Sequence, residues 1–231
     1  VDPPPFASAD VRSSKDQQGC SSPPQEEEAL PPGVSVRRIK KEDADSPDFD
    51  EFQRVSRIAL DGLGGRWEVQ MVEVWDNEAA RRIFEAKQEE LPIKNETLVF
   101  HGSSHEGTRR IAIEGFRIGG EAGWDAKHGA ALGKGVYTGS HPSTALMYSQ
   151  RSDAGESCSV LLCRAQPGLE WDAPQISTRG RSSAQSDWDR TPLFGDSWSG
   201  GLQGVRVFRT AQQLLPTHVI HYTRTPSSRR R

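Results

Sequence analysis

The chain has 231 residues and a formal net charge of −3; 34% of its residues are hydrophobic and 26% are charged. This length fits one domain with a tail, and a pI near 6.1 gives no overall electrostatic footprint for nucleic acid. No apolar run approaches the ~18 residues that span a bilayer, so we expect no membrane association. The three cysteines, Cys20, Cys158 and Cys163, form neither an even-numbered disulfide framework nor a ligand-spaced cluster. We therefore expect a reduced intracellular compartment, the nucleus or the cytoplasm.

The two ends of the chain have the composition of tails. Residues 1–47 are rich in Pro, Ser, Asp and Glu and lack apolar periodicity, which is typical of disorder. Within them, residues 34–41 (VSVRRIKK) fit a short strand or a basic patch, and we expect a solvated mixed-charge segment. Residues 224–231 are basic and end in three arginines. The folded domain is therefore predicted to span residues 48–223.

Hydrophobic spacing predicts two helices and a strand in the first part of this domain. A helical pattern opens at Ser46-Pro47 and is ended by the glycines of residues 62–65. Alternation over residues 67–75 predicts a strand with one buried face. A second helix follows, with Asp76 or Asn77 as its cap. Its predicted apolar stripe consists of Ala80, Ile83, Phe84 and Leu91.

The remaining elements are short and are separated by long loops. Residues 98–101 read as a strand, followed by a short helix that Ser104 or Thr108 could cap, with Ile111 and Ile113 facing inward. Further strands are predicted at residues 136–138, 159–164, 205–209 and 217–222, and a helix is predicted to begin at Pro142. Residues 119–132 and 166–203 are predicted to be loops. The tryptophans in residues 166–203 are expected to contribute to local packing. This pattern favours an α+β domain with a largely antiparallel sheet.

Two short motifs in the central stretch could carry chemistry. His101-Gly102 ends a strand, where an imidazole can donate to a sugar hydroxyl and a glycine leaves its backbone amide open to a ligand. In residues 133–137 (GKGVY), glycines permit close approach and Tyr137 offers a ring face for stacking. Each motif alone is more often an ordinary strand end.

Their joint order is more specific. The succession of HGSS (101–104), EGFRI (114–118), LGKGVYT (132–138) and Tyr148 resembles the catalytic domain of the poly(ADP-ribose) polymerase family, the diphtheria-toxin-like ADP-ribosyltransferases. The likeness covers roughly residues 67–223, and its further segments are VWDN (74–77), FEAK (84–87), DSW (196–198), VFR (207–209) and IHY (220–222). It implies the ADP-ribosyltransferase fold, a mostly antiparallel split sheet with short helices.

The resemblance implies NAD as co-substrate, and it implies no metal. By this likeness His101 bonds the ribose region of NAD, and the backbone of Gly102 clamps the nicotinamide carboxamide, with Ser103 beside it. Arg117 begins the donor loop, residues 119–132. Tyr137 and Tyr148 are expected on the two faces of the nicotinamide ring.

Two positions depart from the family pattern. A serine whose hydroxyl bonds the carboxamide is usual where this chain has Ala145, and its loss should weaken binding by ~0.5–1.5 kcal/mol. The third catalytic position, usually glutamate, falls on Gly204, and no Glu or Asp follows Asp196. Without that carboxylate, polymer growth is not expected.

The sequence therefore predicts a mono-ADP-ribosyltransferase that uses NAD and modifies a protein, with nucleic acid ends as a further acceptor class. An alternative from another class is a catalytically inactive module of the same fold that binds NAD or a partner protein. His218 and His221 are three residues apart on a predicted strand and should face opposite sides, so a shared metal is not expected.

Overall fold

The computed structural model describes residues 29–118, 132–152, 157–172, 194–200 and 204–225. Within them the strands form one sheet in the order β1-β2-β9-β5-β3-β4-β8-β7-β6. The strands are β1 (Val34–Lys40), β2 (Trp67–Asn77), β3 (Thr97–Gly102), β4 (Val136–Gly139), β5 (Ser157–Ala165), β6 (Glu170–Asp172), β7 (Ser197–Ser199), β8 (Val205–Phe208) and β9 (Leu214–Arg224). The helices are α1 (Phe49–Ala59), α2 (Glu78–Glu90), α3 (His105–Glu114) and α4 (Pro142–Ser152), with a 3₁₀ turn at Ala211–Gln213.

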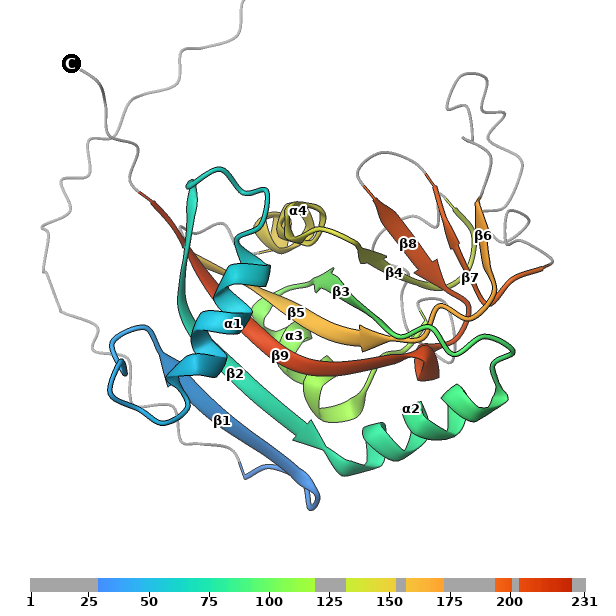
Figure 1. Ribbon diagram of the computed structural model, residues 1–231, viewed down its shortest axis with the longest axis horizontal. Helices are drawn as coiled ribbons and strands as arrows, with labels where there is room; N and C mark the ends of the chain where they lie inside the picture. Colours follow the sequence, from blue (N-terminus) through green and yellow to red (C-terminus); the bar gives the residue numbers. More distant parts are fainter. Residues whose placement is uncertain (1–28, 119–131, 153–156, 173–193, 201–203, 226–231) are drawn as a thin grey trace, which may run out of the picture.

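The sheet is split in its middle. Every pairing is antiparallel except β6 with β7. Among the described residues, β3 and β4 pair at a single position, Phe100 with Gly139. Figure 1 shows β4, β8, β7 and β6 as a second group of strands set beside β3. The expected α+β class with a mostly antiparallel split sheet is confirmed.

The folded part begins earlier than the sequence indicated. Residues 34–41 were expected in a solvated tail, but Val34–Lys40 form β1, which pairs with β2 over its whole length. Ile39 is buried against α1 and β2 in the core. The alternation of apolar and basic residues in this segment is that of an edge strand, whose charged outer face discourages pairing with other chains. The remaining tail residues, 1–28 and 226–231, lie outside the described part of the chain.

Helix ends follow the predicted signals, whereas the buried faces differ. The Asn77 side chain accepts from the Ala80 N–H to begin α2, and Ser104 accepts from the Gly107 N–H to begin α3. In α2 the side chain of Phe84 is buried but that of Ile83 is 52% exposed. The α3 residues Ile111 and Ile113 are only half-buried, and the fully buried positions of that helix are Thr108 and Ala112. Propensity and caps fix a short helix, but the strands it meets decide which side is covered.

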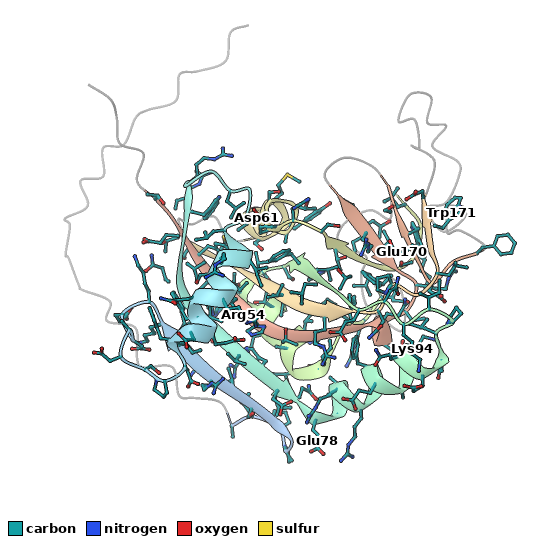
Figure 2. All side chains as sticks on the ribbon, in the orientation of Figure 1. Arg54, Asp61, Glu78, Lys94, Glu170 and Trp171 are labelled. Carbon is teal, nitrogen blue, oxygen red and sulfur yellow. The ribbon has the colours of Figure 1, made fainter. Side chains whose placement is uncertain are left out.

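The predicted loop at residues 166–203 contains two strands. β6 and β7 are three residues each and extend the second half of the sheet. Glu170 of β6 forms an ion pair with Arg206 of β8 (3.1 Å), and Trp171 lies at the rim of this half (Figure 2). Trp198 of β7 is fully buried, as local packing predicted, and Trp188 lies outside the described residues. Strands this short leave no alternation long enough to detect in a sequence.

Two apolar layers cover the sheet, one on each face. The first joins α1 and α4 to strand residues such as Phe100, Val160 and Ile220. The second joins α3 to Val99, Leu161 and other residues of the opposite face. In Figure 1, α1 crosses in front of the sheet and α3 lies behind it. No helix of the described part is both long and apolar enough to cross a membrane.

A buried carboxylate joins β1, β2 and β9. The Glu73 side chain accepts hydrogen bonds from Arg38 Nε (3.2 Å) and Trp75 Nε1 (2.9 Å), and His221 Nε2 lies 3.6 Å away. Burial alone would raise the pKa of Glu73, but His221, Trp75 and Arg38 outweigh burial and lower this pKa to about 2. The carboxylate is thus held ionised inside the domain, and its charge contributes to stability.

We expect Glu73→Gln to lower the free energy of unfolding by about 2 kcal/mol at pH 7, because the substitution removes the charge that three groups face. The pKa of Glu73 is lower in the folded than in the unfolded state. Its contribution is therefore present above about pH 4.5 and fades as the pH falls toward about 2. Urea unfolding of parent and variant across this range measures the difference. Glu68→Gln, on an exposed part of the same strand, is the matched control and should change little.

Candidate active site

His101 stands where β3 and β4 part. Its Nδ1 lies 2.8 Å from the carbonyl oxygen of Tyr137 on β4, so the ring bridges the split in the sheet. The ring of Phe116 meets it edge-on, with centroids 5.0 Å apart and planes at 87°. The imidazole is therefore fixed from both β4 and the chain that follows α3.

The Tyr137 contact fixes which nitrogen of His101 carries the proton. A carbonyl oxygen only accepts, so Nδ1–H must donate to it. Burial lowers the pKa of His101, although the bond to Tyr137 acts in the other direction, and the neutral ring is favoured. Its Nε2 then presents a lone pair, with no partner among the described residues. The sequence suggested a donor; the structure instead offers a hydrogen-bond acceptor.

Gly102 lies against α4 so closely that only glycine fits. A Cβ added there would come within 1.8 Å of the Ala145 carbonyl oxygen. Ala145 itself, where the sequence pattern predicts the family's serine, is buried in the core layer with Phe100 and Leu146. The end of β3 and the first turns of α4 therefore form one packed unit. On the β4 side of that unit, the pairing described between β3 and β4 is limited to Phe100 and Gly139.

Tyr137 uses its hydroxyl within the protein. The hydroxyl accepts from the Leu132 N–H and donates to the Gly133 carbonyl, both at 2.8 Å. Trp198 Nε1 donates to the carbonyl of Leu132 from the other side, also at 2.8 Å. The tyrosine thus anchors the start of the Gly133-Lys134-Gly135 entry to β4. Nothing in the local sequence signalled this double anchor, since its Trp198 half comes from a distant strand.

The other predicted site residues lie at different depths. Ser103 follows β3, and its Oγ lies against Gly107 of α3. Tyr148 is half-buried on α4, nearly one turn beyond Ala145. Arg117 is exposed and pairs with Glu114 at 3.0 Å. The predicted donor loop falls mostly on residues 119–131, outside the described part.

Gly204, which the sequence pattern predicts at the third catalytic position (below, the third corner of the site), adjoins the end of β4. Its carbonyl accepts from the Ser140 N–H at 2.9 Å, and its φ of 66° lies in the left-handed region that favours glycine. A Cβ there would lie 3.6 Å from His141 Cδ2 and 3.7 Å from Ser140 Oγ, which are ordinary contacts. Sequence reasoning did not single out Ser140 or His141. They reach this corner because Gly139 pairs with Val205, a register that the sequence does not reveal.

The two histidines of β9 face opposite sides, as predicted. His218 Nε2 bonds Glu51 of α1 at 2.9 Å, while His221 faces Glu73 and the ring of His105. Within the described ranges, no group of three or more His, Cys, Asp or Glu side chains is arranged to hold a metal ion.

Comparison with family models adds an independent finding. The model of the poly(ADP-ribose) polymerase catalytic domain matches residues 49–186, more than half of the chain. The chain belongs to this family. No curated protein sequence matches it. The family match ends before Gly204, so the third corner of this polymerase-family domain rests on the sequence pattern and the structure.

Family membership places the domain among ADP-ribosyltransferases that use NAD. The end of β3 and the start of β4 carry three features that the sequence pattern predicts for the nicotinamide half of that substrate. They are a His101 Nε2 with no partner in the described residues, a glycine at position 102, and aromatic side chains on β4 and α4. Binding sites for flat amide ligands usually combine fixed polar groups with aromatic side chains.

Gly102→Ala should displace α4 from β3, because its methyl group would overlap the Ala145 carbonyl. We expect a loss of about 3 kcal/mol in unfolding free energy, toward the upper end of overpacking costs, together with loss of NAD binding. Thermal unfolding and calorimetry with NAD measure the two effects. Gly65→Ala is the control: its Cβ would meet nothing within 4 Å, so only the cost of its positive φ should appear. Equal effects of the two substitutions would contradict the close packing.

Proposed function

We propose that this domain is a mono-ADP-ribosyltransferase, which transfers ADP-ribose from NAD to a protein acceptor and releases nicotinamide. The observation that carries the proposal is the combination of the His101–Gly102–Tyr137 cleft with a third corner that has no side chain. The cleft supports NAD as substrate. The empty corner supports one transfer rather than chain growth.

Each residue of the cleft has a separate part in this proposal. His101 Nε2, an acceptor in the neutral ring, takes a hydrogen bond from a ribose hydroxyl. The backbone of Gly102 holds the carboxamide, and the rings of Tyr137 and Tyr148 confine the nicotinamide. Because these groups are positioned before the substrate arrives, little reorganisation is needed as charge develops on the sugar. Ser103 and Arg117 are proposed to contact NAD farther from the reacting bond.

Chain growth requires a group that polarises the hydroxyl of a bound ADP-ribose. Gly204 cannot supply it, and no Asp or Glu follows Asp196 in the sequence. The positive φ of Gly204 also places the backbone in a conformation that a glutamate would adopt only at a cost of about 1–2 kcal/mol. The corner is therefore built as a glycine turn, and the remaining groups support a single transfer.

A second candidate function is an inactive module that binds NAD or a partner protein. The Ala145 methyl favours it, because it removes one hydrogen bond to the carboxamide, about 0.5–1.5 kcal/mol. Calorimetry with NAD separates the two: binding without nicotinamide release supports the inactive module. The acceptor could also be a nucleic acid end, which digestion of the labelled product by nuclease or protease would reveal.

Incubation of the purified chain with labelled NAD tests the leading proposal. We expect incorporation of label together with nicotinamide release, and a decrease of about tenfold or more in His101→Ala, which loses its hydrogen bonds to ribose and to Tyr137. Thermal unfolding of the variant shows whether it remains folded. The proposal fails if the parent releases no nicotinamide and labels neither itself nor added protein.

The Gly204→Glu variant tests how a carboxylate at this position would affect nicotinamide release. A Cβ at residue 204 makes only ordinary contacts, so we expect a folded protein that is less stable by about 1–2 kcal/mol because of the positive φ. Nicotinamide release should rise relative to Gly204→Gln, which has the same shape and backbone cost but no charge. We expect no polymer from either variant on a denaturing gel. Equal rates for the two variants would show that this corner does not face the reacting sugar.

A further inference from the structure

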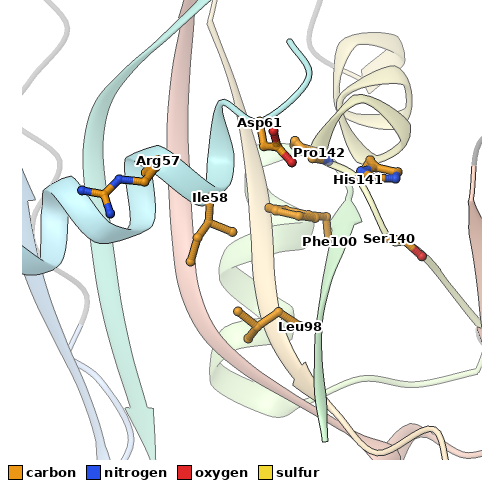
Figure 3. A pocket seen from close by; sticks show the side chains of 8 residues that line it. All are labelled: Arg57, Ile58, Asp61, Leu98, Phe100, Ser140, His141 and Pro142. Atoms are coloured by element: carbon orange, nitrogen blue, oxygen red, sulfur yellow. The ribbon is translucent and has the colours of Figure 1, made fainter.

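A pocket of about 340 Å³ opens beside the third corner, on the face of β3 where α4 packs. Its apolar part consists of Ile58 on α1 and Leu98 and Phe100 on β3 (Figure 3). Leu98 is 39% exposed although its neighbours on this face are buried. The pocket therefore offers uncovered apolar surface of the size of one or two side chains.

The polar part of the pocket comes from two separate elements. Asp61 follows α1, and Ser140 and His141 join β4 to α4. Figure 3 shows the Asp61 carboxylate directed toward the β4–α4 junction, whereas the guanidinium of Arg57 points away and only its stem lines the pocket. In the described residues, neither Asp61 nor His141 has a side-chain hydrogen bond or ion pair. Both side chains are thus available to a ligand.

The same junction forms the neighbourhood of Gly204. His141 Cδ2 would lie 3.6 Å from a Cβ at that position, and the Ser140 N–H bonds the Gly204 carbonyl. A side chain on residue 204 would therefore point toward His141. In the described part of the chain, the His141 imidazole is the ionisable side chain among the nearest neighbours of a Cβ at residue 204.

We propose that His141 is the base that deprotonates the acceptor, and that the acceptor is a hydroxyl-bearing side chain of a polypeptide whose neighbouring apolar residue fills the pocket. The inference rests on the proposed transferase function. A carboxylate acceptor is already ionised near neutral pH and would be repelled by Asp61, whereas a hydroxyl is neutral and needs a proton acceptor. The apolar wall gives the segment beside the hydroxyl a surface on which to pack.

The step balances without a further reactant. The bond between C1′ of the ribose and the pyridine nitrogen of NAD breaks, and nicotinamide leaves as a neutral molecule with that electron pair. The acceptor oxygen supplies the pair for the new C1′–O bond. Its proton passes to the His141 imidazole and from there to solvent. Asp61, on the other side of the pocket, favours the positive charge that His141 acquires.

The test uses the full chain with labelled NAD and two synthetic peptides, Arg-Leu-Ser-Gly and Arg-Leu-Glu-Gly. We expect label on the serine peptide or on hydroxyls of the protein itself. This label should be stable to neutral hydroxylamine, which releases ester-linked ADP-ribose.

His141→Gln should slow this transfer by about 100-fold or more while leaving the affinity for NAD within twofold. The parent rate should rise with pH as the proposed base loses its proton; of the charged residues that line the pocket, Asp61 is directed toward the β4–α4 junction and the Arg57 guanidinium points away. In the variant this rise should disappear.

Ser143→Ala is the matched control, since Ser143 is exposed on the first turn of α4 and should leave transfer unchanged. Free imidazole should partly restore transfer in His141→Gly, which a merely structural role would not allow. Three results would overturn the assignment: hydroxylamine-labile label, an unchanged pH profile in His141→Gln, or nicotinamide release without hydroxyl-linked label. Absence of nicotinamide release from the parent would count against the transferase function itself.

Discussion

The contact between Gly102 and α4 is the constraint on which the rest of the site depends. The Ala145 carbonyl occupies the space where any other residue at position 102 would place its Cβ. This approach fixes α4 on the end of β3, and with it the junction that connects α4 back to β4. In the part of the chain that the structure describes, the two halves of the sheet then pair at Phe100 and Gly139 alone. One close backbone contact thus positions the end of β3 against the first turns of α4.

The split sheet is held open by groups that would otherwise be available for binding. The His101 Nδ1–H donates to the Tyr137 carbonyl. The Tyr137 hydroxyl accepts from the Leu132 N–H and donates to the Gly133 carbonyl. The His101 bond joins β3 to β4 where their strand pairing ends, and the Tyr137 hydroxyl bonds hold the segment that leads into β4. They also decide what remains for a substrate, namely the Nε2 lone pair and the ring faces. In His101, Nδ1 therefore supports the fold and Nε2 is left for a substrate. In Tyr137, the hydroxyl supports the fold and the ring faces are left for a substrate.

Much of this arrangement could be predicted from local sequence, because it depends on local physics. Caps such as Ser104, the strand ending at His101-Gly102 and the helix opened by Pro142 all act over a few residues. β1 was missed because an edge strand with a charged outer face has the composition of a tail. The tautomer of His101 and the placement of His141 beside Gly204 depend on strand register between segments far apart. No pattern within either segment encodes that register.

The empty third corner is more than the loss of one side chain. Gly204 adopts a φ of 66°, and in that conformation its carbonyl receives the Ser140 N–H. A residue with a side chain in the usual extended conformation would turn this carbonyl away and release the β4–α4 junction. The register that pairs Gly139 with Val205 brings Ser140 and His141 beside Gly204, and the Gly204 carbonyl then accepts from the Ser140 N–H. A side chain at residue 204 would alter this backbone bond as well as add a functional group, so the glycine and the β4–α4 junction act as one structural unit.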